Sequence, residues 1–180
     1  MKKKTKIAFL DRDGVINSSK INDGYIGKIK DFKWINGSKK AIKYLKSKNY
    51  KVVIVTNQSG IARGYFKLKD LYKIHSYLKK ELKKIGTSVD KIYFCPFHKD
   101  GIIKKYKKDS SLRKPKIGMF RLAEKKWNID KPNSFMIGDQ ITDIKFAKKA
   151  NIKGYFFQEK NLLKFIKNKL EPVKISQNQN

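Results

Sequence analysis

Four short segments of the sequence carry residue types that could do chemistry. They are DRDG at 11–14, TNQSG at 56–60, RKP at 113–115 and GDQITD at 138–143. Three of them directly follow apolar runs, so their acids and threonine stand where strands would end. Together the segments supply carboxylates, a hydroxyl, an arginine and a lysine, which is a set that could hold a cation and a phosphate group.

The carboxylates decide which chemistry is open to this set. Acids held close together repel one another, and a cation relieves that repulsion. Hard oxygen ligands suit Mg²⁺, which also takes substrate phosphate as a ligand. Asp11 could act as a nucleophile that forms an aspartyl-phosphate, and Asp13 could protonate the leaving oxygen and then deprotonate water. Gly14 would let the chain turn so that both acids face one point.

Each segment also has a purely structural interpretation. An acid pair after a strand can form a turn, TNQSG can be a turn, and the acids of GDQITD can stabilise a helix N-terminus. RKP by itself carries little information. The order of the four segments, each after its own strand, favours one catalytic site over four unrelated turns and caps.

Strands and helices are expected to alternate along the chain, as judged from β-branched runs and from helical spacing of apolar residues. The expected strands are 6–10, 51–55, 91–95, 134–137 and 154–157, and the expected helices are 38–47, 68–85, 118–127, 142–150 and 161–170. This alternation predicts an α/β fold in which helices cover both faces of a mainly parallel sheet. Ligands of such folds bind at the carboxyl ends of the strands, where the four segments lie.

The 180 residues suit one domain, which we expect over 1–170, followed by a polar tail at 171–180. The stretch between Asp13 and Trp34 is too short for a large cap domain. The apolar run before Asp11 is only the four residues 7–10, and no apolar run reaches the ~20 residues that span a bilayer. With its single cysteine, the chain is expected to be a cytoplasmic protein, monomeric and without a membrane partner.

The motifs also carry a family resemblance. DRDGVIN at 11–17, VVIVTN at 52–57, RKP and IGDQITDI at 137–144 together resemble the haloacid dehalogenase-like (HAD) phosphatase superfamily. TNQSGIARG at 56–64 and RKPKIGM at 113–119 narrow the resemblance to the heptose bisphosphate phosphatase and histidinol phosphatase family. It covers roughly residues 6–157 and implies a Rossmann-like three-layer α/β/α sandwich without a large cap.

The resemblance also implies roles for the acids. Asp11 would be the nucleophile and a Mg²⁺ ligand. Asp13 would be the general acid and base and would bind Mg²⁺ through its main-chain carbonyl. Asp139 would be the third ligand, with Asp143 supporting the metal site from behind.

By the same resemblance, Thr56 would hydrogen-bond the transferring phosphoryl group and Lys114 would neutralise its charge. Arg113 would recognise the rest of the substrate. Further substrate contacts are expected from Asn22, Asp23, Gly24, Tyr25, Asn57, Gln58 and Ser59. The implied reaction is Mg²⁺-dependent hydrolysis of a small sugar phosphate, with heptose 1,7-bisphosphate cleaved at its 7-phosphate as the leading candidate, in the supply of nucleotide-activated heptose.

One expected feature of this family is missing from the sequence. Members often carry a zinc loop, Cys-x-His followed by Cys-x-Cys just before RKP. The matching positions read CPF at 95–97 and SSL at 110–112, so Cys95 alone is retained, and His98 stands one position away. Because a structural zinc site needs four such ligands, no zinc is expected here.

The formal net charge of +30 raises the alternative of a nucleic-acid partner. Only four of the 45 basic residues are arginines, and the lysines are spread over the whole chain, which favours a compositional origin. The remaining alternatives are a histidinol phosphatase, a nucleic-acid 3′-phosphatase and, last, a basic binding protein without catalysis. His75, in the second helix, is expected to be structural rather than catalytic.

Overall fold

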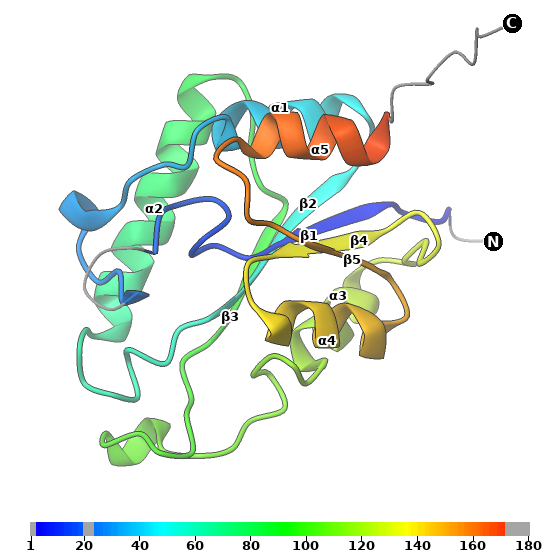
Figure 1. Ribbon diagram of the computed structural model, residues 1–180. Helices are drawn as coiled ribbons and strands as arrows, with labels where there is room; N and C mark the ends of the chain where they lie inside the picture. The colour runs from blue at the N-terminus through cyan, green and yellow to red at the C-terminus, as the bar shows by residue number, and fades with distance from the viewer. Residues whose placement is uncertain (1–2, 20–23, 172–180) are drawn as a thin grey trace, which may run out of the picture.

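The apolar runs of the sequence form one parallel sheet (Figure 1). The computed structural model describes residues 3–19 and 24–171. The strands are β1 (Ile7–Leu10), β2 (Lys51–Asn57), β3 (Lys91–Cys95), β4 (Phe135–Gly138) and β5 (Lys153–Phe156). They are ordered β3-β2-β1-β4-β5, and each pair of neighbours is parallel.

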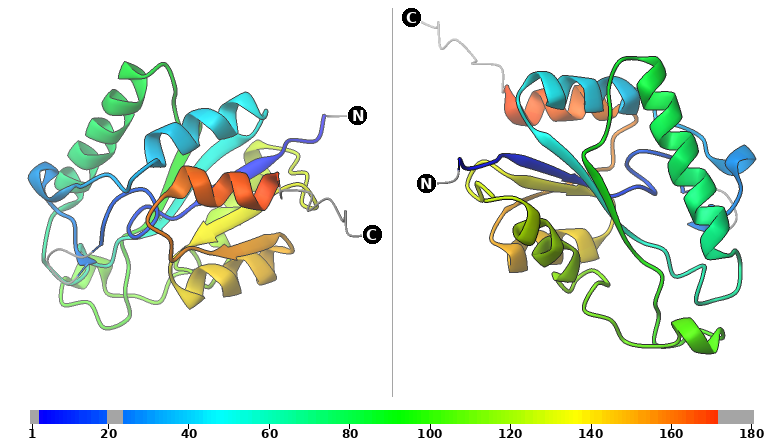
Figure 2. Two further views of the ribbon diagram at one scale, coloured as in Figure 1. Left: turned by 45° about the horizontal axis from the view of Figure 1, so that its top comes forward. Right: turned by 180° about the vertical axis from the view of Figure 1, so that it is seen from behind.

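Helices cover both faces of this sheet. They are α1 (Ser38–Ser47), α2 (Leu68–Lys84), α3 (Gly118–Lys126), α4 (Ile141–Ala150) and α5 (Leu162–Leu170), with short 3-10 helices η2 (Ile29–Asp31) and η3 (Lys104–Tyr106). Figure 1 shows α1 and α5 together on one face and α3 and α4 on the other, and Figure 2 shows α2 running beside β3. The expected three-layer α/β/α sandwich is confirmed. Within the described residues, no helix has the length and apolar character needed to cross a membrane.

Side-chain alternation along β1 explains why both faces need helices. Ala8 and Leu10 belong to the core beneath α1, α2 and α5, while Ile7 and Phe9 belong to the core beneath α3 and α4. All four residues are fully buried. Successive side chains of a strand point to opposite faces, so a central strand of a parallel sheet has to be apolar throughout. This requirement accounts for the uninterrupted run that precedes Asp11.

The second strand is longer than the sequence pattern predicted. Thr56 and Asn57, expected in the turn after residue 55, continue β2 and pair with Phe94 and Cys95 of β3. The β3 strand runs alongside β2 to this point, so the ladder can extend. Thr56 and Asn57 are therefore held by strand pairing at the edge of the site rather than placed on a free turn.

The chain order puts the centre of the sheet at a switch point. The chain moves outward from β1 through β2 to β3, and then returns to the other side of β1 with β4 and β5. In open α/β sheets, ligands bind in the crevice at the carboxyl ends of the strands where this direction reverses. The crevice here lies between the ends of β1 and β4, where DRDG and GDQITD begin.

We expect Phe9→Ala to lower the free energy of unfolding by about 3–5 kcal/mol, because it leaves a cavity between Phe120 and Phe146, whose rings contact Phe9. Urea denaturation followed by circular dichroism measures the change. Leu122→Ala, at a half-exposed position of α3, is the control and should cost less than about 1 kcal/mol. Equal losses in the two variants would contradict this account of the core.

Candidate active site

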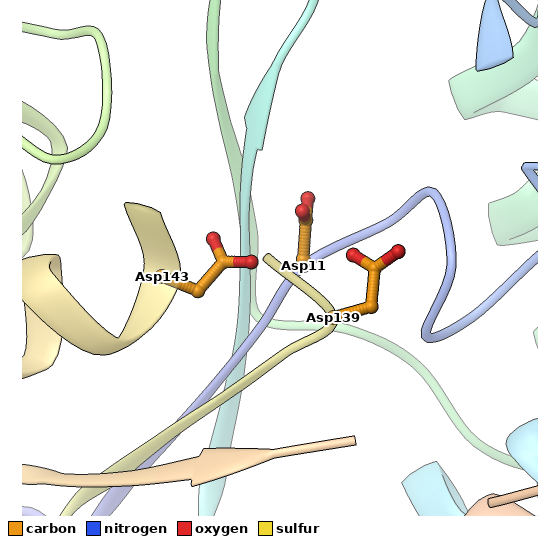
Figure 3. Close-up of side chains that lie close together, drawn as sticks. All are labelled: Asp11, Asp139 and Asp143. Carbon is orange, nitrogen blue, oxygen red and sulfur yellow. The ribbon is translucent and has the colours of Figure 1, made fainter. Parts of the chain in front are cut away.

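Three carboxylates meet where β1 and β4 end (Figure 3). Asp11 follows β1, and its backbone N–H donates to the carbonyl of Ile137 in β4 at 2.9 Å. Asp139 follows β4, and Asp143 lies in the first turn of α4. Each acid offers an oxygen that lies within 4.8 Å of the others. Segments far apart in the sequence thus converge on one concentrated negative charge.

Two glycines make room for this convergence. A Cβ atom at Gly14 would lie 2.0 Å from Oδ2 of Asp139, and Gly14 also has a positive φ of 83°. A Cβ atom at Gly138 would lie 2.2 Å from the side chain of Asp143. Any larger residue at either position would displace an acid, so the glycines of DRDG and GDQITD are part of the site's geometry.

Lys114 supplies the positive charge at the centre of the cluster. Its side chain is 1% exposed, and its Nζ lies 3.1 Å from Oδ2 of Asp11 and 2.6 Å from Oδ1 of Asp143. The same ammonium donates to the carbonyl of Val55 in β2 at 2.8 Å. Burial lowers the pKa of Lys114, but the two carboxylates outweigh burial and raise it overall. The lysine is therefore held charged and fixed by three oxygens.

Even with this partner, the cluster has too little positive charge. Burial raises the pKa of Asp11 to about 7, against the opposing effect of Lys114, and the neighbouring acids add to the rise. Burial also raises the pKa of Asp139. Oδ1 of Asp139 is buried and has no hydrogen-bond partner among the described residues. A divalent cation would meet both needs, so these acids fit a metal site made of hard oxygen ligands.

Asp143 is already engaged by other groups. Besides the ion pair with Lys114, its Oδ2 accepts the backbone N–H of Gln140 at 3.1 Å, which caps the N-terminus of α4. Its Oδ1 is thus in an ion pair and its Oδ2 in a hydrogen bond. The oxygens of Asp11 are engaged as well, since Oδ1 accepts the backbone N–H of Arg12 at 2.7 Å and Oδ2 pairs with Lys114. Asp11 and Asp139 line one pocket and Asp143 does not, so their oxygens are better placed to hold a cation, with Asp143 behind them.

The carboxylate of Asp13 lines the same pocket as Asp11. It accepts hydrogen bonds from the side chains of Arg12, Asn17 and Gln58. The Nε2 of Gln58 also donates to Oγ1 of Thr56 at 2.8 Å. The turn after β1 therefore brings both acids of DRDG to one cavity, as the sequence predicted.

Asn57 differs from the sequence expectation in where its side chain is used. Its Oδ1 accepts the backbone N–H of Lys114 at 3.0 Å, and its Nδ2 donates to the carbonyl of Lys114 at 3.2 Å. This amide pair clamps the loop that carries Lys114 to the end of β2. Asn57 lines the pocket, but its hydrogen-bonding groups already hold the Lys114 backbone rather than facing a substrate unpaired.

A pocket of about 610 Å³ opens over the acids. Of the residues expected to contact substrate, Gly24, Tyr25, Asn57, Gln58, Ser59 and Arg113 line it, together with Asp11, Asp13, Lys114 and Asp139. Thr56 is 1% exposed and is not among the lining residues, and its Oγ1 accepts a hydrogen bond from Gln58, which is. Asn22 and Asp23 lie outside the described residues. The pocket also has three lining residues that were not singled out from the sequence, which are Ser19, Gln140 and Thr142.

One arginine lines this pocket, and a second lies near it. Arg113 lines it, and Nη1 of Arg113 is buried without a hydrogen-bond partner among the described residues. Burial lowers the pKa of Arg113, and the nearby Arg63 lowers it further. Nη2 of Arg63 lies 3.3 Å from Nε2 of His98. A bound anion would supply a hydrogen-bond acceptor and offset the positive charge of these arginines. The sequence predicted a substrate contact for Arg113 but not for Arg63.

The loop that lacks the zinc ligands is held by ordinary contacts. Cys95 is fully buried, its Sγ donates to the carbonyl of Phe97 at 3.7 Å, and burial raises the pKa of its thiol. Ser110, where the second pair of ligands would begin, accepts the backbone N–H of Leu112 at 3.2 Å. Further along the loop, the N–H of Ile103 donates to the carbonyl of Ala62 at 2.9 Å.

Comparison with known proteins assigns the chain to a family. The sequence model of the family described as polynucleotide kinase 3 phosphatase matches residues 6–163, which is most of the chain. The chain belongs to this family of HAD phosphatases. The resemblance to HAD phosphatases drawn from DRDGVIN, VVIVTN, RKP and IGDQITDI is thereby confirmed.

This HAD phosphatase chain also has well-covered relatives. It is 41% identical over 160 residues to a D-glycero-beta-D-manno-heptose-1,7-bisphosphate 7-phosphatase of Rhodopseudomonas palustris, with 89% of this chain and 87% of the relative covered. It is 40% identical over 181 residues to a D-glycero-alpha-D-manno-heptose-1,7-bisphosphate 7-phosphatase of Campylobacter jejuni, with 92% and 98% covered. The two relatives differ in the anomer that they are named for.

A solved structure gives the same picture. The D,D-heptose 1,7-bisphosphate phosphatase of B. bronchiseptica, complexed with magnesium and phosphate, superposes on this HAD phosphatase with a TM-score of 0.76. The two chains are 31% identical, and the match covers 90% of this chain and 86% of the other. The parallel sheet and its helices are therefore those of a HAD phosphatase.

His75 has a predicted effect on stability at low pH. It is 6% exposed in α2, and burial, followed by the charges of Arg12 and Lys79, lowers its pKa from 6.5 to about 3. An unfolded chain binds a proton at His75 that the folded chain rejects, so stability should fall as the pH drops from about 6.5 towards 3. One such proton contributes a slope of up to about 1.4 kcal/mol per pH unit.

The measurement is the free energy of unfolding from pH 4 to 7 in a His98→Gln background, which leaves His75 as the one histidine. Adding His75→Gln should flatten the pH dependence by about one proton. If the two proteins show the same slope, the buried neutral state of His75 is wrong.

Proposed function

We propose that the chain is a Mg²⁺-dependent phosphatase that works through an aspartyl-phosphate on Asp11. The observation that carries this proposal is the contact of the Asp11 carboxylate with the buried ammonium of Lys114, beside Asp139, at the switch point of the sheet. A carboxylate fixed next to a cation and facing a pocket is suited to attack a phosphoryl group whose negative charge the same cation neutralises.

In the first step, an oxygen of Asp11 attacks phosphorus, and the bond from phosphorus to the leaving oxygen breaks. Asp13, in the same pocket, gives a proton to that oxygen. In the second step, Asp13 takes a proton from water, the water oxygen attacks phosphorus, and the bond to Asp11 breaks to release phosphate. Lys114 neutralises the phosphoryl oxygens during both steps, so most of the catalysis is positioning and charge neutralisation. The hydroxyl of Thr56 accepts a hydrogen bond from Gln58 and keeps its own proton, which we propose it donates to the phosphoryl group.

The proposed metal ligands are Asp11, Asp139 and, by family analogy, the main-chain carbonyl of Asp13, with Asp143 holding Lys114 behind them. The unpartnered oxygen of Asp139 and the raised pKa of Asp11 support this set. When bound, Mg²⁺ would offset the repulsion among the acids and draw charge from the phosphoryl oxygens.

We propose heptose 1,7-bisphosphate, cleaved at its 7-phosphate, as the substrate. The names of the relatives support this choice, and so does the group of Arg113 and Arg63, which offers an unpaired donor to a second phosphate. The relatives include both anomers, so the anomer is left to experiment. A single catalytic domain over 1–170, acting as a monomer in the cytoplasm, belongs to the same proposal.

Two other phosphate esters are alternative substrates for the same site. Histidinol phosphate would use the same chemistry. A nucleic-acid 3′-phosphate is favoured by two observations, which are the description of the matching family and the net charge of +30. A binding role without catalysis would leave the paired nucleophile and acid without use.

The test is phosphate release with Mg²⁺ from both anomers of heptose 1,7-bisphosphate, fructose 1,6-bisphosphate, histidinol phosphate and a 3′-phosphorylated oligonucleotide. We expect one heptose anomer to give the highest kcat/KM, and Asp11→Asn or excess EDTA to reduce release by at least about 10³-fold, because the nucleophile or the charge that offsets it is lost. If the oligonucleotide gives the highest kcat/KM, the proposed substrate is a nucleic-acid 3′-phosphate and not a sugar phosphate. Unchanged phosphate release by Asp11→Asn would refute the proposal that Asp11 is the nucleophile.

Arg113→Met should raise KM for the preferred bisphosphate by about 10–100-fold, as expected from losing a charged hydrogen bond of about 1.5–3 kcal/mol. The KM for the matching monophosphate, which lacks the second charge, should change little. The matched control is Arg121→Met, since Arg121 lies exposed on α3 and pairs with Glu124. Equal effects on the two substrates would contradict a role in binding the second phosphate.

A further inference from the structure

We propose that Arg12 is a positioning residue that holds the carboxylate of Asp13 in its place on the pocket wall. This inference rests on the proposed function, because it concerns the residue that exchanges the proton. Arg12 lies between the two acids of DRDG, a position for which the sequence alone predicted no role. It is 0% exposed and, unlike Lys114, is not among the residues that line the pocket, so any effect it has on the reaction passes through its neighbours.

The contact between Arg12 and Asp13 uses the edge of the guanidinium that carries Nε and Nη2. Nη2 of Arg12 lies 2.9 Å from both oxygens of Asp13, and Nε lies 3.1 Å from Oδ1. A planar fork of this kind fixes the direction of a carboxylate as well as its charge. The side chain of Asp13 keeps 17% of its surface exposed, whereas that of Arg12 keeps none. Asp13 therefore faces the pocket while Arg12 grips it from the protein side.

Two amides complete the grip on Asp13. Nδ2 of Asn17 donates to Oδ1 at 2.9 Å, and Nε2 of Gln58 donates to Oδ2 at 2.7 Å. These donors approach from opposite ends of the carboxylate, and Gln58 ties it to β2 through Thr56. Among these donors, Arg12 alone contacts both oxygens, so it is the one that sets the plane of the group.

His75 supports Arg12 on the side away from Asp13. Its Nε2 lies 3.5 Å from Nη1 of Arg12, and its ring packs against Phe94. Since a neutral imidazole nitrogen can accept a hydrogen bond, His75 can satisfy the guanidinium without adding a second charge. The arrangement runs from α2 through His75 and Arg12 to Asp13, and it links the helix layer to the pocket wall.

The backbone of Arg12 closes the turn that bears these groups. Its carbonyl accepts the N–H groups of Ile16 at 2.8 Å and Asn17 at 3.0 Å. Substituting the side chain of Arg12 leaves these backbone hydrogen bonds available. A mutation can therefore remove the side-chain contact with Asp13 without removing the turn. A buried ion pair can also contribute only to the folded structure. The experiment therefore has to distinguish a purely structural role of Arg12 from a role in positioning Asp13.

Substrates whose leaving groups differ in their need for a proton distinguish the two roles of Arg12. An alkyl phosphate releases a poor leaving group that needs the proton from Asp13, whereas p-nitrophenyl phosphate releases a stable phenolate that does not. We would measure kcat/KM, which covers only the steps up to departure of the leaving group. The substrates are p-nitrophenyl phosphate and the alkyl phosphate of the panel that the wild type hydrolyses best.

Arg12→Met should lower kcat/KM on the alkyl phosphate by on the order of 10²-fold and on p-nitrophenyl phosphate by less than about 10-fold, in the pattern of Asp13→Asn. Arg12→Lys keeps the buried charge but not the fork, so it should fold and recover part of the alkyl activity. Arg121→Met is the control and should change neither substrate.

Equal losses on the two substrates, or no loss on either, in Arg12→Met and Arg12→Lys would overturn the inference. Should Arg12→Met fail to fold, the same comparison in Arg12→Lys decides, because a selective loss on the alkyl phosphate supports positioning and an equal loss refutes it. A wild type inactive on both substrates would instead overturn the proposed function itself.

Discussion

The ion pairs of Lys114 with Asp11 and Asp143 are the interaction on which the rest of the site depends. Buried carboxylates within 4.8 Å of one another are mutually repulsive, and burial adds to the cost of their charge. A single buried ammonium offsets part of that charge and leaves the remainder for a cation. Its bond to the carbonyl of Val55 also ties the loop to β2, so the charge balance and the shape of the pocket have one origin.

The topology of the sheet explains why Lys114 and the acids can come together. Asp11 and Asp139 come from strands that are adjacent in space, and the crossing at the switch point leaves a crevice between their ends. Lys114 has to be brought from a loop beyond β3, and the extension of β2 through Asn57 makes that possible. The side chain of Asn57 clamps the backbone of Lys114, which places the ammonium within reach of both acids.

Neighbouring residues of the turn after β1 have different positions relative to the pocket. Asp13 faces the pocket, and Arg12, its neighbour in sequence, is buried behind it with His75 for support. Rigid support of this kind keeps a reacting group in place without occupying the pocket. The loop after β3 keeps its position through packing and hydrogen bonds, although it lacks the ligands of a zinc site. The place of Arg113 in the pocket lining depends on that loop.

The sequence alone determined the order of strands and helices, the three layers, and the acids that end β1 and β4, because strand periodicity and short motifs are local properties. It also predicted which loops approach the site, since parallel strands end at one edge. The tertiary structure decided that Asn57 clamps the Lys114 backbone, that Arg63 lies near Arg113 and that Arg12 grips Asp13. These facts depend on side-chain direction and on distances between remote segments, and local patterns do not encode either.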